Sequence, residues 1–542
     1  MQPQPPAMPM SAQVPADRPE RMSSLERLAV LVTLVLAMVP AVLWPGDTPW
    51  ILDEPQEVAI ALQANQHHEL ASHGLTGNFY LKYGPLPMQI YQVMLLFSHD
   101  PRVLVVLRGA LCSVMTAGSL LWLGRSLRLN LWFATAVVLA PQLWLNNRSL
   151  WAANVAIPIG TLALAAYASF LRTGSGWSFV PAVGAAIAPL FIHPQAAPLS
   201  AAIIGHMLWR QRSSLWRHRF GVLAALGLLA ILNFGYLRYA TSAVYQSLGW
   251  SVRSGYPGRM SRMAALAGPL MGGRLFSGGE FDVAHCPLSG PAGFIATARV
   301  LASASIPLVW LGVGLSLCRW MGRRRACDET CNASPESSTG WHGRVRLPVS
   351  HATQEPSARS TLVDVALAGL VMQSLYFGIL RVPPAPQYFF GTFALYVLLA
   401  WTAVDALLRL RAIIIAAYGL SLALITLSTI WHVHRDGWPR GTMSPTLNEQ
   451  VELVRELNRY TDTSAWTDVS CYQFEKPYAL WVLRMLYPQE PGQPSRTSGR
   501  LVIRYRTGPG GHSGRIELIE ARGDADIPPN ARRVSLYYPY PK

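Results

Sequence analysis

Uncharged apolar runs of bilayer length recur along most of this chain of 542 residues. The first run, residues 28–44, contains no charged side chain. A helix needs about 20 predominantly apolar residues to cross the hydrocarbon core of a bilayer. Only 14% of all residues are charged, whereas a soluble protein carries about 25%. The sequence therefore predicts a mainly α-helical, polytopic transmembrane bundle.

We expect about eleven spans on this length criterion. They are predicted near residues 28–44, 102–123, 130–145, 151–171, 178–192, 195–209, 220–237, 294–318, 361–380, 387–407 and 411–431. Several of these runs are short. The two on either side of His193 are predicted to form a broken or hairpin arrangement.

Arginines in the loops between the apolar runs predict the orientation, because cytoplasmic loops of membrane proteins carry an excess of Lys and Arg. The loops that this rule assigns to the cytoplasm contain Arg125, Arg128, Arg172, Arg210, Arg212, Arg217, Arg219, Arg319, Arg323, Arg324, Arg325, Arg409 and Arg411. We therefore expect a bacterial-type inner-membrane protein with a cytoplasmic N-terminus and a periplasmic C-terminus. The outer loops would be residues 45–101, 146–150, 238–293 and 381–386. The net charge of +16 follows this distribution and forms no basic stripe with aromatics, so no nucleic-acid partner is expected.

Composition divides the chain into three parts. Residues 1–27 are Pro-rich and polar and are predicted to be a disordered cytoplasmic N-terminus before an uncleaved first span. Residues 28–431 form the membrane domain, and residues 432–542 form a polar periplasmic domain. Within the membrane domain, residues 321–360 are rich in Ser, Arg and Pro and are predicted to be a flexible cytoplasmic linker.

The C-terminal part combines helix and strand patterns. Residues 445–460 place Leu447, Val451, Val454 and Leu457 at helical spacing. The segments "LVIRYR", "RIELIE" and "RVSLYY" predict short strands separated by turns. We expect a small extramembrane α/β domain.

The acidic pair Asp53 and Glu54 stands just beyond the first span. As a structural feature, Asp53 would cap a helix, with Gln56 at its third position. Val58, Ala61 and Leu62 would form the apolar face of this helix, which is predicted to lie along the membrane. Gly74 would terminate this helix or a following turn. On this motif alone, capping is the favoured role.

The predicted topology brings further polar residues to the same outer face. They are Lys82, Tyr83, Arg148, His193, Arg381, Gln387 and Tyr388. Taken singly, the cations can extend to the interface, His193 can be a packing residue, and Tyr388 can belong to an aromatic belt. Because ionisable groups at membrane depth are costly and usually functional, their common placement favours an active site.

These segments together resemble the GT-C superfamily of integral-membrane glycosyltransferases over about residues 28–431. The matching order is a span, an outer "DE", an amphipathic helix, then "KYGPL", "NNRSLWAAN", "FIHPQ" and "PQYFF". The branch they resemble most contains the protein O-mannosyltransferases and lipid A aminoarabinose transferases. That family usually has "KPPL" where this chain has "KYGPL", so either Lys82 or Tyr83 occupies the family's lysine position. Gln387 stands where a histidine is frequent, and Phe393 falls near a frequent proline.

The resemblance implies a role for each matching residue. Asp53 would be the general base and Glu54 would assist or orient it. Lys82 or Tyr83, together with Arg148, would bind the phosphate of a polyprenyl-phosphate-sugar donor. His193, Gln387 and Tyr388 would line the cavity. The implied reaction is an inverting transfer to a lipid, glycan or protein acceptor at the outer face of the membrane.

Two other functions are compatible with many spans. A transporter or flippase of a lipid-linked sugar explains the spans and cations but gives the acidic pair no role. A scaffold that binds a partner through its C-terminal domain is the second. Neither metal nor cofactor is expected, although one outer loop contains Glu280, Asp282, His285 and Cys286. Of the six cysteines, Cys286 and Cys471 are both predicted outside, where a disulfide can persist.

Overall fold

The computed structural model describes most of the membrane part and pieces of the C-terminal part. The described residues are 22–50, 53–76, 82–239, 292–332, 357–380, 386–438, 445–459, 464–467, 478–487, 500–507, 514–521, 526–527 and 532–534. The loop with Glu280, Asp282, His285 and Cys286 lies outside them, as do Arg381 and Cys471. The predicted pairing of Cys286 with Cys471 is therefore not described.

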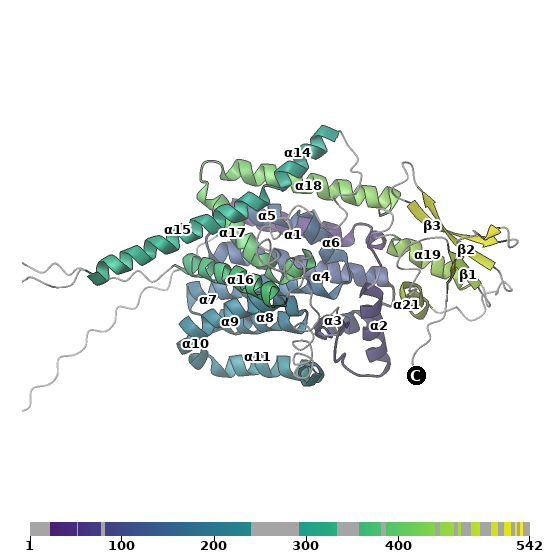
Figure 1. Cartoon of the computed structure of the whole chain (residues 1–542), viewed down its shortest axis with the longest axis horizontal. Coiled ribbons are helices and arrows are strands. Elements are labelled where there is room, and N and C mark those ends of the chain that lie inside the picture. Colours follow the sequence, from purple (N-terminus) through teal and green to yellow (C-terminus); the bar gives the residue numbers. More distant parts are fainter. Residues whose placement is uncertain are drawn as a thin grey trace, which may run out of the picture.

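The described chain is a bundle of helices that run along the long axis of the molecule, with a small sheet at one end (Figure 1). This confirms the predicted fold class. Seven segments are long and apolar enough to cross a bilayer. Their helices are α1 (Ser24–Val42), α4 (Pro101–Ser126), α7 (Ala156–Thr173), α15 (Ser305–Asn332), α16 (Ala358–Leu380), α17 (Phe393–Ala406) and α18 (Arg411–Asp436).

The other four expected spans correspond to shorter or interrupted helices. These are α5 (Trp132–Val138) with α6 (Pro141–Arg148), α8 (Gly176–Ile187) with η3 (Ala188–Phe191), η4 (Pro194–Ala196) with α9 (Ala197–Arg210), and α11 (Arg219–Leu232). α10 (Arg212–Arg217) joins α9 to α11, and α14 (Ala292–Ala302) precedes α15.

Prolines cause two of the breaks. The expected continuous span at 130–145 is wrong, because Ala140 takes an extended conformation (φ −61°, ψ 129°) before Pro141. The proline ring disfavours the helical conformation at the preceding residue. The predicted break at His193 is confirmed, since His193 is likewise extended before Pro194.

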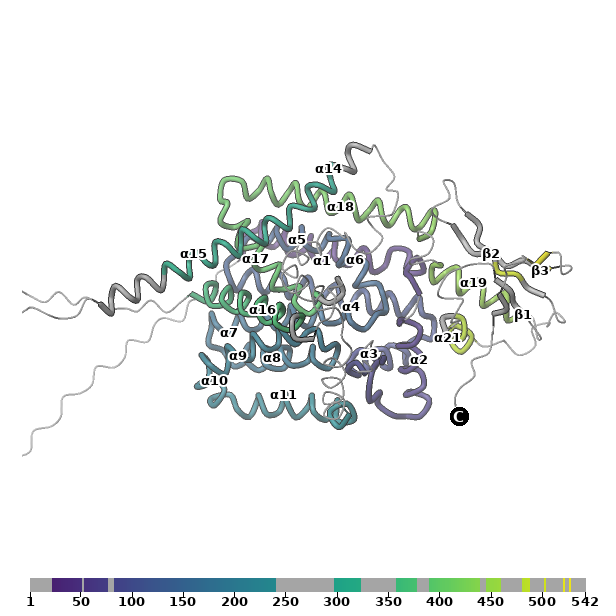
Figure 2. Tube along the Cα trace, in the orientation of Figure 1, coloured from purple at the N-terminus to yellow at the C-terminus, as the bar shows by residue number. Residues whose placement is uncertain are grey.

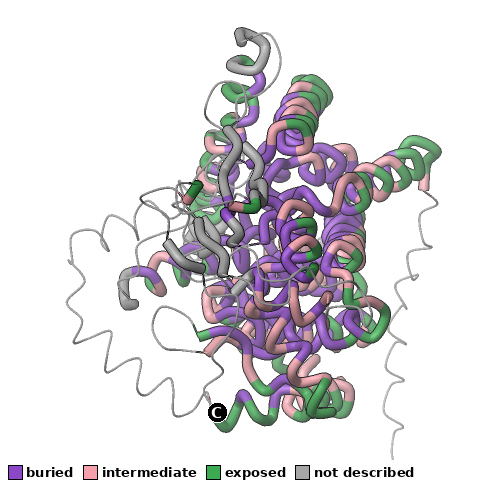
Figure 3. The backbone as a smooth tube through the Cα atoms, turned by 90° about the vertical axis from the view of Figure 1, so that its right-hand side faces the viewer, coloured by how far each residue is buried: buried purple, intermediate pink, exposed green. Residues whose placement is uncertain are grey.

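The centre of the bundle is fully packed. In α17, every residue from Phe393 to Val404 is buried. α4 contacts both α1 and α7, and α7 in turn contacts α8. Exposed apolar side chains lie on the outer helices, such as Leu31 of α1 and Leu420 of α18. Buried chain therefore forms the middle of the bundle and exposed chain its rim, as expected for helices that face lipid (Figure 3).

The C-terminal part contains α19 (Leu447–Leu457), α21 (Tyr478–Leu486) and a four-stranded sheet in the order β3-β2-β1-β4. The strands are β1 (Ser464–Thr467), β2 (Arg500–Thr507), β3 (Gly514–Ala521) and β4 (Arg532–Val534). β1 and β2 are parallel, whereas the β2–β3 and β1–β4 pairs are antiparallel. β2 and β3 coincide with two expected strands, β4 covers the start of the third, and β1 was not expected.

The C-terminal part is docked on the chain that follows α1. Leu447 donates its backbone N–H to the carbonyl of Thr48, and Gln450 donates to the carbonyl of Trp50. The buried side chains of α19 and α21 join one apolar core with Val58 of α2 (Asp53–Gln66) and Met88 of α3 (Leu86–Leu95). Figure 2 shows these elements gathered at one end of the bundle.

Two expected boundaries differ from the structure. The C-terminal domain was expected to begin at residue 432, but that position lies inside α18, which continues to Asp436. The flexible linker was expected from residue 321, but α15 continues to Asn332 and includes Cys327 and Cys331.

Candidate functional site

The acidic turn at the start of α2 differs from the expected capping arrangement. α2 begins at Asp53 itself, so Asp53 lies in the first helical turn and not at the cap that precedes it. The predicted apolar face is confirmed by the burial of Val58, Ala61 and Leu62. Gly74 does not end the helix, which stops at Gln66. Instead, Gly74 donates its N–H to the carbonyl of Tyr83 (2.8 Å).

The loop from Ser149 to Ala152 contacts the three carboxylates of this turn, those of Asp53, Glu54 and Glu57. Ser149 Oγ donates to Glu54 Oε1 (2.9 Å), and the backbone N–H of Ala152 donates to Glu57 Oε2 (2.7 Å). The carboxylate of Asp53 lies close to the Trp151 side chain. Asp53, Glu54 and Glu57, all in the first turns of α2, thus meet one segment of chain. The acids of α2 are oriented by the loop that carries the "NNRSLWAAN" motif.

Glu57 was not predicted as a site residue. It is fully buried, and its second oxygen, Oε1, has no hydrogen-bond partner. Its spacing of four residues from Asp53 places both on one helix face, which was the available signal in the sequence.

Arg108 was also missed, although it is a lone cation inside an apolar run, a pattern that often marks a functional position. It lies in α4 and is fully buried. Its Nη1 donates to the carbonyls of Asn146 (2.8 Å), Asn147 (3.3 Å) and Ser149, and its Nη2 donates to the carbonyl of Trp151 (2.9 Å). This single side chain fixes the backbone of the loop that orients Asp53 and Glu54.

Burial controls the protonation of the acidic turn. It raises the pKa of Asp53, and the neighbouring Trp151 side chain opposes this shift. The pKa of Glu57 is raised well above its ordinary value, first by burial and then by the charges of Asp53 and Glu54. Carboxylates this close do not all ionise together, because each additional negative charge raises the cost of the next. Of Asp53 and Glu57, Glu57 favours its protonated form more strongly.

Replacing Glu57 with Gln is expected to preserve stability at neutral pH, because the amide keeps an acceptor for the Ala152 N–H without a buried charge. Glu57→Ala leaves that N–H unpaired, which costs about 1–3 kcal/mol. Since the folded-state pKa of Glu57 is raised, stability should fall as pH rises from 4.5 through that pKa. Thermal unfolding in detergent across this range tests both points, and an unchanged pH dependence in Glu57→Gln would contradict them.

The residues of the "KYGPL" motif contact other parts of the chain. Lys82 Nζ lies 2.9 Å from His73 Nε2, and the Lys82 backbone is hydrogen-bonded to the hydroxyls of Tyr236 and Tyr239. Gly84 crosses the backbone of Phe191 so closely that a Cβ would lie 1.9 Å from its carbonyl oxygen. Only glycine fits this crossing. It sets Tyr83 beside the chain that carries His193.

His193 is buried, and its ring lies against that of Tyr83 with 4.2 Å between centroids. Its Nδ1 accepts the backbone N–H of Gln195 (3.3 Å), so the proton of the neutral ring is on Nε2. Burial lowers the pKa of His193 to about 3, which keeps the ring neutral at physiological pH. Lys82 therefore contacts His73, whereas Tyr83 contacts His193. The two candidates for the family's lysine position thus have different neighbours.

Arg148 contacts the chain just after α1. It is buried, donates to the carbonyl of Trp44, and lies over the Trp144 ring at 4.6 Å. Burial lowers the pKa of Arg148 to about 10, and the charge of Asp47 opposes this shift. Two of its donors, Nε and Nη1, have no partner.

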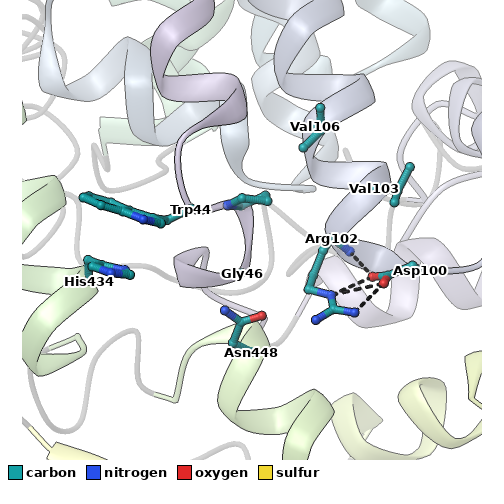
Figure 4. Close-up of a pocket in the computed structure, with 9 residues that line it drawn as sticks. Trp44, Gly46, Asp100, Arg102, Val103, Val106, His434 and Asn448 are labelled. Atoms are coloured by element: carbon teal, nitrogen blue, oxygen red, sulfur yellow. Dashed lines mark hydrogen bonds and ion pairs between the residues drawn. The ribbon is translucent and has the colours of Figure 1, made fainter.

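Trp44 adopts a left-handed conformation (φ 47°) and stacks on His434 at 3.8 Å between ring centroids. His434 Nδ1 lies 3.0 Å from Asp47 Oδ2. Beside them is a pocket of about 490 Å³ between the end of α1 and the starts of α4 and α19, into which Arg102 and Asn448 also project (Figure 4).

Gln387 and Tyr388 lie in η5 (Pro386–Thr392), and their side chains are outside the described part of the chain. η5 contacts η4 through Gly391, whose Cβ would lie 2.6 Å from Ala196 Cα. Phe390 meets the Trp151 ring edge-on at 6.0 Å. This turn thus connects the His193 segment with the loop that orients Asp53.

The predicted site residues are therefore brought together in part. Asp53 and Glu54 share one loop, Tyr83 meets His193, and η5 joins these two groups. No described hydrogen bond or ion pair links Asp53, Lys82 and Arg148 to one another. Among the described residues, no group of three or more His, Cys, Asp or Glu side chains is placed to hold a metal ion.

The fold and this end of the bundle define a polytopic helical membrane protein with an oriented acidic turn. No family model matches the sequence, and no curated protein matches it. Two crystal structures of ArnT from Cupriavidus metallidurans, one bound to undecaprenyl phosphate and one in the apo state, are similar in structure. Each is 12% identical, covers 93% of this chain and has a TM-score of 0.45, with 99% and 98% of the ArnT chains covered, respectively.

Proposed function

We propose that this protein is a membrane glycosyltransferase that moves a sugar from a polyprenyl-phosphate-linked donor to an acceptor. The observation that carries the proposal is the docking of the acidic turn of α2 on the Ser149–Ala152 loop. Both segments belong to motifs that resemble the GT-C superfamily, and they lie 95 residues apart where they meet at Glu54 and Ser149. A capping role does not require this contact.

Asp53 is suited to act as the general base. Its raised pKa brings it closer to the working pH, which improves proton acceptance from an acceptor hydroxyl or amine. The side chain of Trp151 lies beside this carboxylate. Glu54, held by Ser149, orients the same turn.

The transfer itself needs one displacement. The acceptor oxygen or nitrogen attacks the anomeric carbon, its proton passes to Asp53, and the bond to the donor phosphate breaks with inversion. The polyprenyl phosphate leaves with the bonding electrons. Cations stabilise this developing charge.

Lys82 and Arg148 are the proposed cations, with Tyr83 as the alternative to Lys82. The unpartnered Nε and Nη1 of Arg148 support its assignment, because a phosphate would satisfy both donors. His193, Gln387 and Tyr388 are proposed to line the cavity. For binding, the loop around Arg148 would open, because its guanidinium is buried in this structure.

The proposed setting is the inner membrane of a bacterial-type cell, with the reaction at its outer face. Residues 1–27 would then lie in the cytoplasm, and residues 432–542 would form the periplasmic domain. This arrangement suits a lipid donor, whose head group stays at the membrane surface while its tail remains in the bilayer.

Purified full-length protein in proteoliposomes should release polyprenyl phosphate from a labelled polyprenyl-phosphate-sugar when a cell-envelope extract supplies acceptors. The label should move to a product that no longer carries the polyprenyl chain. Label that crosses the bilayer while still attached to the lipid would instead identify a transporter or flippase. No movement and no release, with intact folded protein, would leave a scaffold as the function.

A further inference from the structure

A second group of polar and aromatic side chains lies at the end of the bundle opposite to α2. α8 and α11 both begin at this end, where α9 and α10 connect them (Figure 1). A pocket of about 660 Å³ opens between the two helix starts. Its lining includes Gly176 and Trp177 from α8, Arg217 at the end of α10, His218 in the turn that follows, and Phe220 from α11.

The charge around this pocket has one sign. The sequence contains neither Asp nor Glu from residue 101 to residue 279, which includes every residue of the lining. The basic side chains of the same connecting segments are Arg172, Arg210, Arg212, Arg217 and Arg219. Asp364 of α16 acts electrostatically on His206 of α9 and does not line the pocket. The pocket therefore attracts anions.

Hydrogen-bond donors also converge on it. Neither α8 nor α11 has a side-chain cap at its start. The first N–H groups of a helix lack partners in their own helix, and the helix dipole makes this end positive. Gly176 allows the α8 start to approach His218, because a Cβ there would lie 2.7 Å from the imidazole. His218 Nε2 has no hydrogen-bond partner.

The aromatic side chains indicate that the anion is part of a lipid. Trp177 is 91% exposed and Phe220 is 73% exposed. Arg219 lies over the Phe220 ring at 4.7 Å, and Arg210 lies over Trp209 at 4.9 Å. Exposed aromatics beside arginines are typical of the level where acyl chains meet head groups. A soluble anion would gain nothing from Trp177 and Phe220.

We propose that this pocket binds the phosphate head group of an anionic phospholipid. Arg217 and His218 would contact the phosphate, the start of α8 would donate backbone N–H groups, and Trp177 with Phe220 would flank the upper acyl chains. Basic pockets between membrane helices are known to select acidic lipids in this way. The site is independent of the glycosyl transfer proposed above.

Native mass spectrometry of the delipidated full-length protein in detergent tests the site. The probes are phosphatidylglycerol, phosphatidylcholine with the same acyl chains, and glycerol phosphate. We expect wild type to favour phosphatidylglycerol. Loss of charge-assisted hydrogen bonds in R217Q/H218Q should weaken that binding about tenfold. Arg409→Gln is the matched control, since Arg409 is an exposed arginine between α17 and α18.

Gly176→Ala provides a second variant, because it keeps every charge while its Cβ displaces the His218 ring. Gly176→Ala should weaken phosphatidylglycerol binding. Arg409→Gln should therefore bind this lipid more tightly than Gly176→Ala does. Equal affinity of wild type and R217Q/H218Q for phosphatidylglycerol would overturn the proposal. So would equal affinity of wild type for the two phospholipids, or competition by glycerol phosphate at the same concentration, which would indicate a site for soluble phosphate.

Discussion

Asp53→Asn is expected to lower the rate of glycosyl transfer by about 10²–10⁴-fold, the usual consequence of losing a general base. The substitution separates catalysis from structure. An Asn side chain keeps an oxygen beside Trp151, and it is nearly isosteric with Asp. It loses only the capacity to take the acceptor proton at neutral pH.

Asp100→Asn is the matched control for this substitution. Asp100 also stands at a helix start near the same end, where its carboxylate accepts the backbone N–H of Arg102 at 2.8 Å. Asn caps a helix about as well as Asp, so this variant should retain its activity. Wild-type transfer by a folded Asp53→Asn protein would remove Asp53 from the reaction and return it to a structural role.

The pH profile gives the same test in the wild type. Because burial raises the pKa of Asp53 above 3.8, the acidic limb of kcat/KM should lie above that value. Activity should fall as pH drops through the raised pKa, since protonated Asp53 cannot accept a proton. Burial also raises the pKa of Glu57 in the same turn, and the charge of Asp53 adds to that shift. The acidic limb therefore reports on the coupled acids together.

The sequence predicts those features of the fold that depend on local composition. Apolar runs long enough to span a bilayer located the seven long apolar helices α1, α4, α7, α15, α16, α17 and α18. The spacing of Leu447, Val451, Val454 and Leu457 located α19, and all four side chains are fully buried. The error at 130–145 arose because hydropathy was given more weight than Pro141, although the proline already marked the break.

Local composition and spacing do not predict contacts between segments that are distant in the sequence. Nothing near Asp53 indicates that Trp151, almost a hundred residues later, will lie beside its carboxylate. The contact of Arg148 with the carbonyl of Trp44 depends on how α6 meets the end of α1. The shared core of α2 with α21 likewise joins segments that composition assigned to two separate domains.

Arg108 shows how a functional signal can be present in the sequence and still be missed. The presence of Arg108 inside the run at 102–123 did not change its assignment as a span. The structure gives that arginine four carbonyl partners from one loop. The planar guanidinium suits this task, because its donors lie in a fixed geometry that can bind several acceptors at once.

Replacing Arg108 with Met is expected to destabilise the protein by at least about 1–3 kcal/mol, the cost of leaving one buried hydrogen-bonding group unpaired. The carbonyls of Asn146, Ser149 and Trp151 would lose their shared donor in a region closed to water. Arg108→Lys keeps the charge but cannot reach all of these oxygens. Since misplacing a catalytic group by about 1 Å can cost about 10²-fold in rate, Arg108→Lys should remain folded and lose activity to that extent.

Arg102→Met and Arg102→Lys are the matched controls on the same helix. Arg102 pairs with Asp100 at 2.6 Å, but both side chains are about a quarter or more exposed, so the pair contributes about 0–1 kcal/mol. Thermal unfolding in detergent and transfer in proteoliposomes measure the two effects separately. If Arg108→Lys transferred sugar at the wild-type rate, the Ser149–Ala152 loop would hold Asp53 and Glu54 without help from α4. The loop would then be held by its other contacts, from Glu54 to Ser149, from Tyr91 to the carbonyl of Leu150 and from Glu57 to the N–H of Ala152.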